Sequence, residues 1–141
     1  MTLVLGWTFA EVCAAVERFE LDGAGFEFAN GYAGIDLDNV VLDDGSLKPF
    51  AAESVNLMNS YTEYSPSGKG LHILFKLLLP LSEFSPRRRN DELGIEIYGS
   101  GRFFTVTVKI YSTPKSLQKR TQEAQKIYED YFSRERIKFQ I

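Results

Sequence analysis

The chain has 141 residues, a hydrophobic content of 44% and a formal net charge of −3. This length predicts one domain over residues 1–141, with enough apolar residues for a buried core. The negative charge excludes an overall basic surface for nucleic acid, so any such contact must be local. The single cysteine, Cys13, excludes an intramolecular disulfide, and with only one histidine a structural zinc site is not expected.

No stretch of the sequence has the length or apolar character of a signal peptide or a membrane span. The apolar start, Met1 to Trp7, is too short, and the run from Leu77 to Leu81 contains Pro80. A cytoplasmic protein without membrane association is therefore expected.

In the N-terminal half, apolar residues at helical spacing predict a helix that begins after Thr8 and ends near residues 21–23. Residues 26–28 and 32–38 alternate around an Asn-Gly turn, which predicts a β-hairpin. Good helix formers behind a proline predict a second helix over residues 49–59.

The C-terminal half contains two predicted strands in sequences of the buried type and a charged amphipathic helix. A Gly-Ser-Gly turn after the second strand predicts that this strand forms a hairpin with the residues that follow the turn. The elements are a small-residue loop at 65–70, a strand at 71–75, a polar excursion at 80–91, a hairpin of 94–98 with 102–108, and a helix at 116–132. The whole pattern indicates an α+β fold with flanking helices.

Three acidic residues lie between aliphatic ones in the predicted strands. Strand geometry places Asp36 and Asp38 on one face, roughly 6.5 Å apart along the backbone. Glu96, between Ile95 and Ile97, is on a strand that could pair beside the first. Carboxylates that repel each other need a compensating partner, and hard oxygen ligands suit Mg²⁺ or Mn²⁺. The alternative is that Asp36 and Asp38 end a strand and cap a turn, with Glu96 on a solvated sheet face.

The loop from Ser65 to Gly70 precedes the strand that carries His72, the only histidine. Its glycines allow backbone N–H groups to approach a phosphate, Ser65 and Ser67 add hydroxyl groups, and Lys69 adds charge. The loop is not a P-loop, because the spacing differs and a strand follows instead of a helix. A histidine that is simply hydrogen-bonded within a sheet is the alternative for His72.

Positive charge is concentrated in Arg87, Arg88 and Arg89. These side chains could contact a nucleic-acid backbone. A solvated loop explains the same residues equally well.

Four segments in this order resemble the motifs of the archaeo-eukaryotic primase superfamily, and most closely the primase-polymerase domains of phage and plasmid replication proteins. They are Gly34-Ile35-Asp36-Leu37-Asp38, Ser65-Pro66-Ser67-Gly68-Lys69-Gly70-Leu71-His72, Gly94-Ile95-Glu96-Ile97-Tyr98 and Gly101-Arg102-Phe103-Phe104-Thr105-Val106-Thr107. The resemblance implies an RRM-like primase-polymerase fold, with a mixed or antiparallel sheet and flanking helices. It also implies a DNA primase or DNA polymerase of phage, plasmid or mobile-element replication.

The resemblance also implies roles for individual residues. Asp36, Asp38 and Glu96 would hold two Mg²⁺ or Mn²⁺ ions, and His72 would contact the incoming nucleotide. The nucleotide pocket would be completed by Ser65, Ser67, Lys69 and Arg102. The implied partners are nucleoside triphosphates, a single-stranded or primed DNA template, a helicase or other replication protein, and a second copy of the chain.

The sequence departs from the family pattern in three places. Only 35 residues precede Asp36, so a shortened N-terminus relative to family members is expected, and a helicase domain like that of many relatives is not expected. Where relatives continue Phe-Thr-Val-Thr-Gly, this chain has Thr107-Val108-Lys109. These departures leave open a truncated, non-catalytic module that binds nucleotide, nucleic acid or a replication partner. A metal-dependent nuclease or hydrolase is a further alternative, although the sequence offers no dedicated base to activate water.

Overall fold

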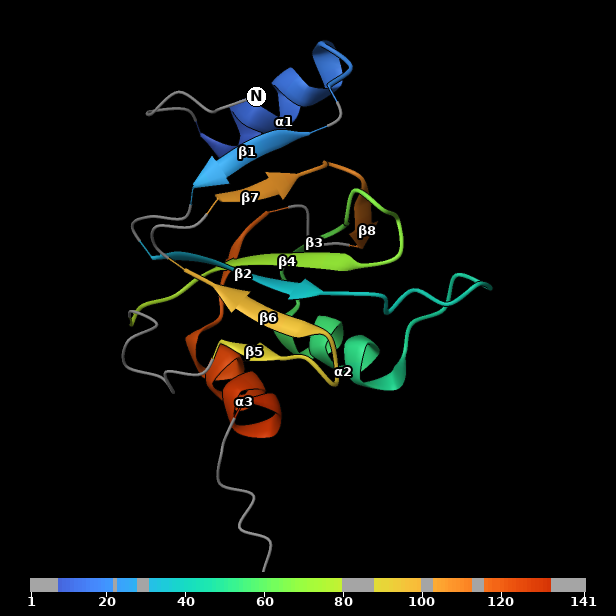
Figure 1. Cartoon of the computed structure of the whole chain (residues 1–141). Coiled ribbons are helices and arrows are strands. Elements are labelled where there is room, and N and C mark those ends of the chain that lie inside the picture. The colour runs from blue at the N-terminus through green and yellow to red at the C-terminus, as the bar shows by residue number, and fades with distance from the viewer. Residues whose placement is uncertain are drawn as a thin grey trace, which may run out of the picture.

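The computed structural model describes residues 8–21, 23–27, 31–79, 88–99, 103–112 and 116–132. Its centre is a seven-stranded sheet in which neighbouring strands follow the order β5-β6-β2-β4-β3-β8, and β9 pairs with β4. Helices α2 and α3 lie to one side of this sheet, and helix α1 lies to the other with the two-stranded sheet β1-β7 (Figure 1). The predicted α+β class with a mixed sheet is confirmed, because β4 and β9 are parallel and the other pairs are antiparallel.

The described residues form three helices and nine strands. They are α1 (Phe9–Arg18), β1 (Ala24–Glu27), β2 (Tyr32–Leu37), α2 (Pro49–Met58), β3 (Tyr61–Tyr64), β4 (Leu71–Lys76), β5 (Arg89–Asn90), β6 (Ile95–Tyr98), β7 (Phe103–Val106), β8 (Ile110–Ser112), β9 (Gln118–Lys119) and α3 (Thr121–Tyr131). Among the described residues, no helix combines the length and apolar character that crossing a membrane requires.

The first helix begins after Thr8 as its sequence predicts, and it ends at Arg18, earlier than predicted. The Thr8 side chain accepts a hydrogen bond from the Glu11 N–H at 3.2 Å, which satisfies a free donor at the helix start. Val12 and Val16 are buried against Ala24 of β1. The helix therefore covers the two-stranded sheet rather than the main sheet's helical side.

Alternation along the central strands separates two faces of the main sheet. Ala33, Ile35 and Leu37 of β2 are fully buried under α2 and α3. The opposite face carries a smaller apolar cluster around Tyr61 and Leu74. Because side chains alternate along a strand, the polar side chains that lie between the buried residues of β2, β4 and β6 belong to this opposite face. The packing against α2 and α3 thus determines which side chains point to the opposite face and are available to form a functional site.

Both predicted hairpins are wrong. Strand β1 pairs with β7, with Ala24 opposite Val106, and neither pairs with the strand expected to be its hairpin partner. The backbone at Gly23 comes so close to β7 that a Cβ on Gly23 would lie 2.7 Å from the Val106 carbonyl oxygen. A pairing between strands about 80 residues apart leaves no local turn signal, so the nearby turn sequences were misleading. Asn30 and residues 100–102, which carried those turn signals, lie outside the described residues.

The last helix starts later than predicted. Gln118 and Lys119 form β9 beside β4, and the Arg120 N–H donates to the Lys76 carbonyl at 2.9 Å. Leu117 packs on the face of the sheet opposite α3. Its helical spacing with the later apolar residues therefore does not reflect a shared helix. The sequence also did not predict strands β3, β5 and β8, whereas the predicted second helix and the strands β2, β4 and β6 are confirmed.

Candidate active site

A row of polar residues crosses five neighbouring strands in register. Arg89 of β5 pairs with Glu96 of β6, Glu96 with Asp36 of β2, Asp36 with His72 of β4, and His72 with Glu63 of β3. Directly paired residues point to the same face of a sheet, at strand spacings of about 4.8 Å. We call these five residues the polar row. The predicted pairing of Glu96 beside Asp36 is confirmed.

Asp36 is the central carboxylate of the row and is electrostatically costly. Its side chain is 19% exposed, and its Oδ1 atom has no hydrogen-bond partner. The Nε2 atom of His72 lies 3.7 Å from Oδ1. Burial raises the pKa of Asp36 to about 6; His72 opposes this rise, whereas Asp38 and Glu96 reinforce it. A largely buried carboxylate, with one oxygen that has no hydrogen-bond partner and two further acids nearby, is a position that a cation would stabilise.

Asp38 lies one residue beyond the end of β2, in a turn, and is exposed. The strand is therefore shorter than predicted, and Asp36 and Asp38 do not share a regular strand face. The turn is held against the start of β6, because the Asp38 N–H donates to the Gly94 carbonyl at 2.7 Å. A Cβ on Gly94 would lie 2.9 Å from the Asp38 carbonyl oxygen, so this close approach requires glycine.

A pocket of about 290 Å³ lies beside the acidic end of the row. Its walls include Asp38, Lys48, Arg89 and Glu96. Arg89 contacts Asp91 at 3.2 Å and Glu96 at 4.0 Å. The pocket thus combines oxygen ligands with two cations, a composition that suits an anion bound together with a metal ion.

The three predicted metal ligands are neighbours, but they are not a ready-made metal centre. Within the described part of the chain, no three acidic, histidine or cysteine side chains converge closely enough to hold a metal ion. The donor chemistry nevertheless fits Mg²⁺ or Mn²⁺, since Asp36, Asp38 and Glu96 offer carboxylate oxygens and Asp36 Oδ1 is unbonded.

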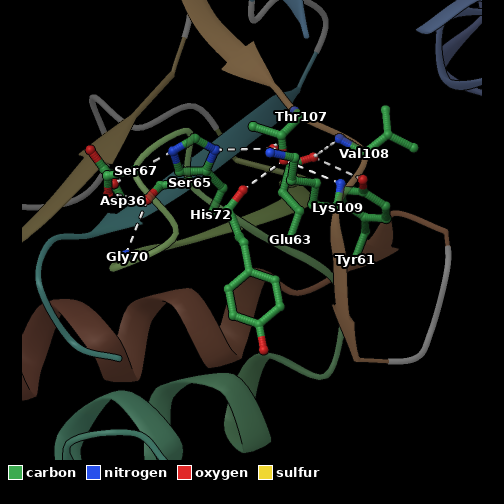
Figure 2. Close-up of polar contacts among 11 residues, drawn as sticks. Asp36, Tyr61, Glu63, Ser65, Ser67, Gly70, His72, Thr107, Val108 and Lys109 are labelled. Atoms are coloured by element: carbon green, nitrogen blue, oxygen red, sulfur yellow. Dashed lines mark hydrogen bonds and ion pairs between the residues drawn. The ribbon is translucent and has the colours of Figure 1, made fainter. Parts of the chain in front are cut away.

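His72 lies between two carboxylates. Figure 2 shows its ring between Asp36 on one side and Glu63 on the other. Its Nδ1 is 3.1 Å from Glu63 Oε2, and the residue as a whole is only 5% exposed. Nδ1 therefore lies within hydrogen-bond distance of a group inside the sheet, as the alternative for His72 predicted. Nε2 faces the acidic side of the row.

The Ser65–Gly70 loop is closed by its own serine side chains. Ser65 Oγ accepts a hydrogen bond from the Gly70 N–H at 3.1 Å, and Ser67 Oγ accepts one from the Lys69 N–H at 3.2 Å. The Lys69 carbonyl in turn accepts from the Val40 N–H at 2.9 Å. The loop therefore lies against the segment that follows Asp38, near the acids (Figure 2). No described contact tests the predicted role of Ser65, Ser67 and Lys69 in binding phosphate.

The arginine cluster is divided between the two faces of the sheet. Arg88 lies 5.8 Å from the ring centre of Tyr128 in α3, whereas Arg89 ends the polar row on the opposite face. Arg87 lies outside the described residues, as does Arg102, the basic residue implied near the nucleotide. The two described arginines do not form one basic surface.

Glu63 belongs to the site but was not predicted from the sequence. It is fully buried, and its carboxylate is within hydrogen-bond distance of groups from β3, β4 and the segment after β7. The available signal was an acid between Tyr61, Thr62 and Tyr64, in a run with the composition of a strand.

The chain was compared with known proteins. No protein-family model matches it. It is similar to a DNA primase-polymerase of Nitratiruptor phage NrS-1, with 33% identity over 104 residues that make up 72% of this chain. The chain spans only about 14% of the length of that relative.

The fold and the polar row define an α+β domain with an acidic site on the sheet face opposite α2 and α3. The similarity to the phage protein supports a primase-polymerase domain, in agreement with the resemblance of the four motifs.

Proposed function

We propose that the chain carries out metal-dependent nucleotidyl transfer, as a DNA primase or DNA polymerase in the replication of a phage, plasmid or mobile element. The observation that carries this proposal is the register of Glu96, Asp36 and His72 on three adjacent strands. It places two acids and an imidazole on one face, beside a pocket whose walls carry both carboxylates and the cations Lys48 and Arg89. The relative's description as a DNA primase-polymerase supports the same reaction class.

In this proposal, the carboxylates of Asp36, Asp38 and Glu96 hold Mg²⁺ or Mn²⁺. When bound, such ions lower the pKa of an attacking hydroxyl group and neutralise charge on a triphosphate. His72 presents Nε2 to the phosphates, and Lys69 and Arg102 add positive charge, as the motif resemblance implies. Cations fixed in a site with little water stabilise developing negative charge more strongly than mobile ions do.

The proposed substrates are nucleoside triphosphates and a single-stranded or primed DNA template. Arg89, at the open end of the polar row, is placed to contact a phosphate of either one. A helicase or other replication protein, or a second copy of the chain, is a proposed partner.

A second candidate is a module that binds nucleotide or nucleic acid without catalysis. It is favoured by the lack of a preformed three-ligand metal cluster among the described side chains. The two candidates agree on the ligand and differ in whether a phosphodiester bond forms.

A primer-extension assay separates these candidates. The chain is incubated with Mn²⁺ or Mg²⁺, primed and unprimed single-stranded templates, and labelled dNTPs or NTPs. We expect extension that is lost in Asp36→Ala and kept in Asp43→Ala, a matched control that removes an exposed carboxylate from the turn after β2. Nucleotide binding without any product would support the binding module, and degradation of the template would support a nuclease.

A further inference from the structure

Glu63 is a buried carboxylate that the proposed chemistry does not use. Its Oε1 accepts hydrogen bonds from the Tyr61 hydroxyl at 2.8 Å and from the Val108 N–H at 3.2 Å. Its Oε2 accepts hydrogen bonds from the Thr107 N–H at 2.7 Å and from the Thr107 hydroxyl at 3.1 Å, and it is 3.1 Å from His72 Nδ1. The side chain is fully buried, so these protein groups replace water entirely.

The direction of these hydrogen bonds determines which ring nitrogen of His72 carries hydrogen. Backbone N–H groups can only donate, so both oxygens of Glu63 act as acceptors. The ring nitrogen beside Oε2 then completes the set as a donor, which places a hydrogen on Nδ1. Nε2 is left as the nitrogen that faces Asp36 and the open side of the row.

We propose that Glu63 is a positioning residue that fixes the ring of His72, so that Nε2 rather than Nδ1 is presented to the triphosphate. The orientation of the ring follows from the hydrogen bonds alone, whereas its use toward a nucleotide rests on the proposed function. Oriented partners behind a functional histidine select its tautomer and limit its motion.

The same carboxylate ties His72 to the segment that follows β7. Val108 has a φ of +61°, a left-handed conformation that is rare for a β-branched residue. Its N–H is one of the two backbone donors to Glu63, and the Thr107 N–H is the other (Figure 2). A strained backbone conformation persists where surrounding contacts hold it in place. Here the contacts of Thr107 and Val108 converge on Glu63, the residue beside His72.

Two variants distinguish positioning from a purely structural role. Glu63→Leu keeps a side chain of similar size and removes both acceptor oxygens, so no acceptor remains for a hydrogen on Nδ1 of His72. Tyr61→Phe removes a buried hydrogen bond to the other oxygen, Oε1, and leaves the contact of Oε2 with His72. It is the matched control for the loss of one buried bond.

The direct readout is the imidazole of His72 in a nitrogen-15 NMR spectrum. The chain has one histidine, so its two ring nitrogens need no further assignment. We expect hydrogen on Nδ1 in the wild type and in Tyr61→Phe, and loss of that state in Glu63→Leu. A bare Nδ1 in the wild type would overturn the proposal even if Glu63→Leu does not fold. An unchanged ring in Glu63→Leu, or equal loss in Tyr61→Phe, would overturn it as well.

The second readout is the dissociation constant for dATP with Mn²⁺. We expect this dissociation constant to rise about tenfold in Glu63→Leu and less than twofold in Tyr61→Phe, while both variants lose thermal stability. Equal weakening in both variants would overturn the positioning role. If the wild type binds no dATP, the proposed function fails, but the ring spectrum still tests the orientation of His72.

Discussion

The charge on Asp36 should make the fold less stable as the pH rises. Burial is the main cause that raises its pKa from 3.8 to about 6. The stability contributed by the neutral carboxyl is fully present below pH 3.8 and is lost as the pH rises through about 6. The shift of about two units corresponds to at most about 3 kcal/mol, and the 19% exposure of the side chain reduces the expected effect to about 2 kcal/mol.

Replacing Asp36 with asparagine removes this titration and keeps the shape of the side chain. The free energy of unfolding of Asp36→Asn minus that of the wild type should therefore be about 2 kcal/mol larger at pH 8 than at pH 4, which means that the variant gains relative stability as the pH rises. Steric and hydrogen-bonding effects of the amide are common to both pH values and cancel in this difference. The measurement is urea unfolding followed by circular dichroism, with EDTA present to exclude divalent metals.

The matched control is Asp43→Asn, which removes an exposed carboxylate and should change stability little at either pH. A stability difference for Asp36→Asn that does not vary with pH would refute the reasoning. So would a larger gain at pH 4 than at pH 8.

Three further outcomes follow from the structure. Mn²⁺ at ten times its dissociation constant should stabilise the wild type by about 1.4 kcal/mol at pH 7.5 in thermal unfolding, and EDTA should reverse this effect. Asp36→Ala should not be stabilised, and equal stabilisation of both proteins would argue against the metal site. Gly70→Ala should destabilise the chain by about 2 kcal/mol or more, because the new Cβ would lie 2.6 Å from the Leu37 carbonyl oxygen; an unchanged urea midpoint would contradict this packing. Glu20→Gly should raise the free energy of unfolding by about 1 kcal/mol, because Glu20 is exposed with a φ of +50° just after α1, and a fall in stability would be inconsistent with strain there.

The sequence predicted those elements whose signals are local. The cap at Thr8 and the alternation around Asp36, His72 and Glu96 depend only on neighbouring residues, and each was placed in the correct helix or strand. The pairing of Glu96 with Asp36 was also expected, because two isolated acids between aliphatic residues have few compatible positions in one sheet.

The missing parts depend on contacts between distant segments. The partners of Glu63 are at Thr107 and Val108, 44 and 45 residues away, and no spacing within β3 reveals them. Val108 itself was noted only as a departure from the glycine of related sequences. Its positive φ gives that departure a physical meaning, since glycine adopts this conformation without steric cost.

The polar row has a consequence for how the protein tolerates insertions and deletions. Its side chains are spaced by the hydrogen bonds between strands, so one residue inserted within β2 or β4 would turn Asp36 or His72 toward α2 and α3. Added residues in the exposed turn at 42–46 would leave that ladder intact. Sequence length is therefore free to vary in the turn, whereas within these strands it is as constrained as the identity of the acids.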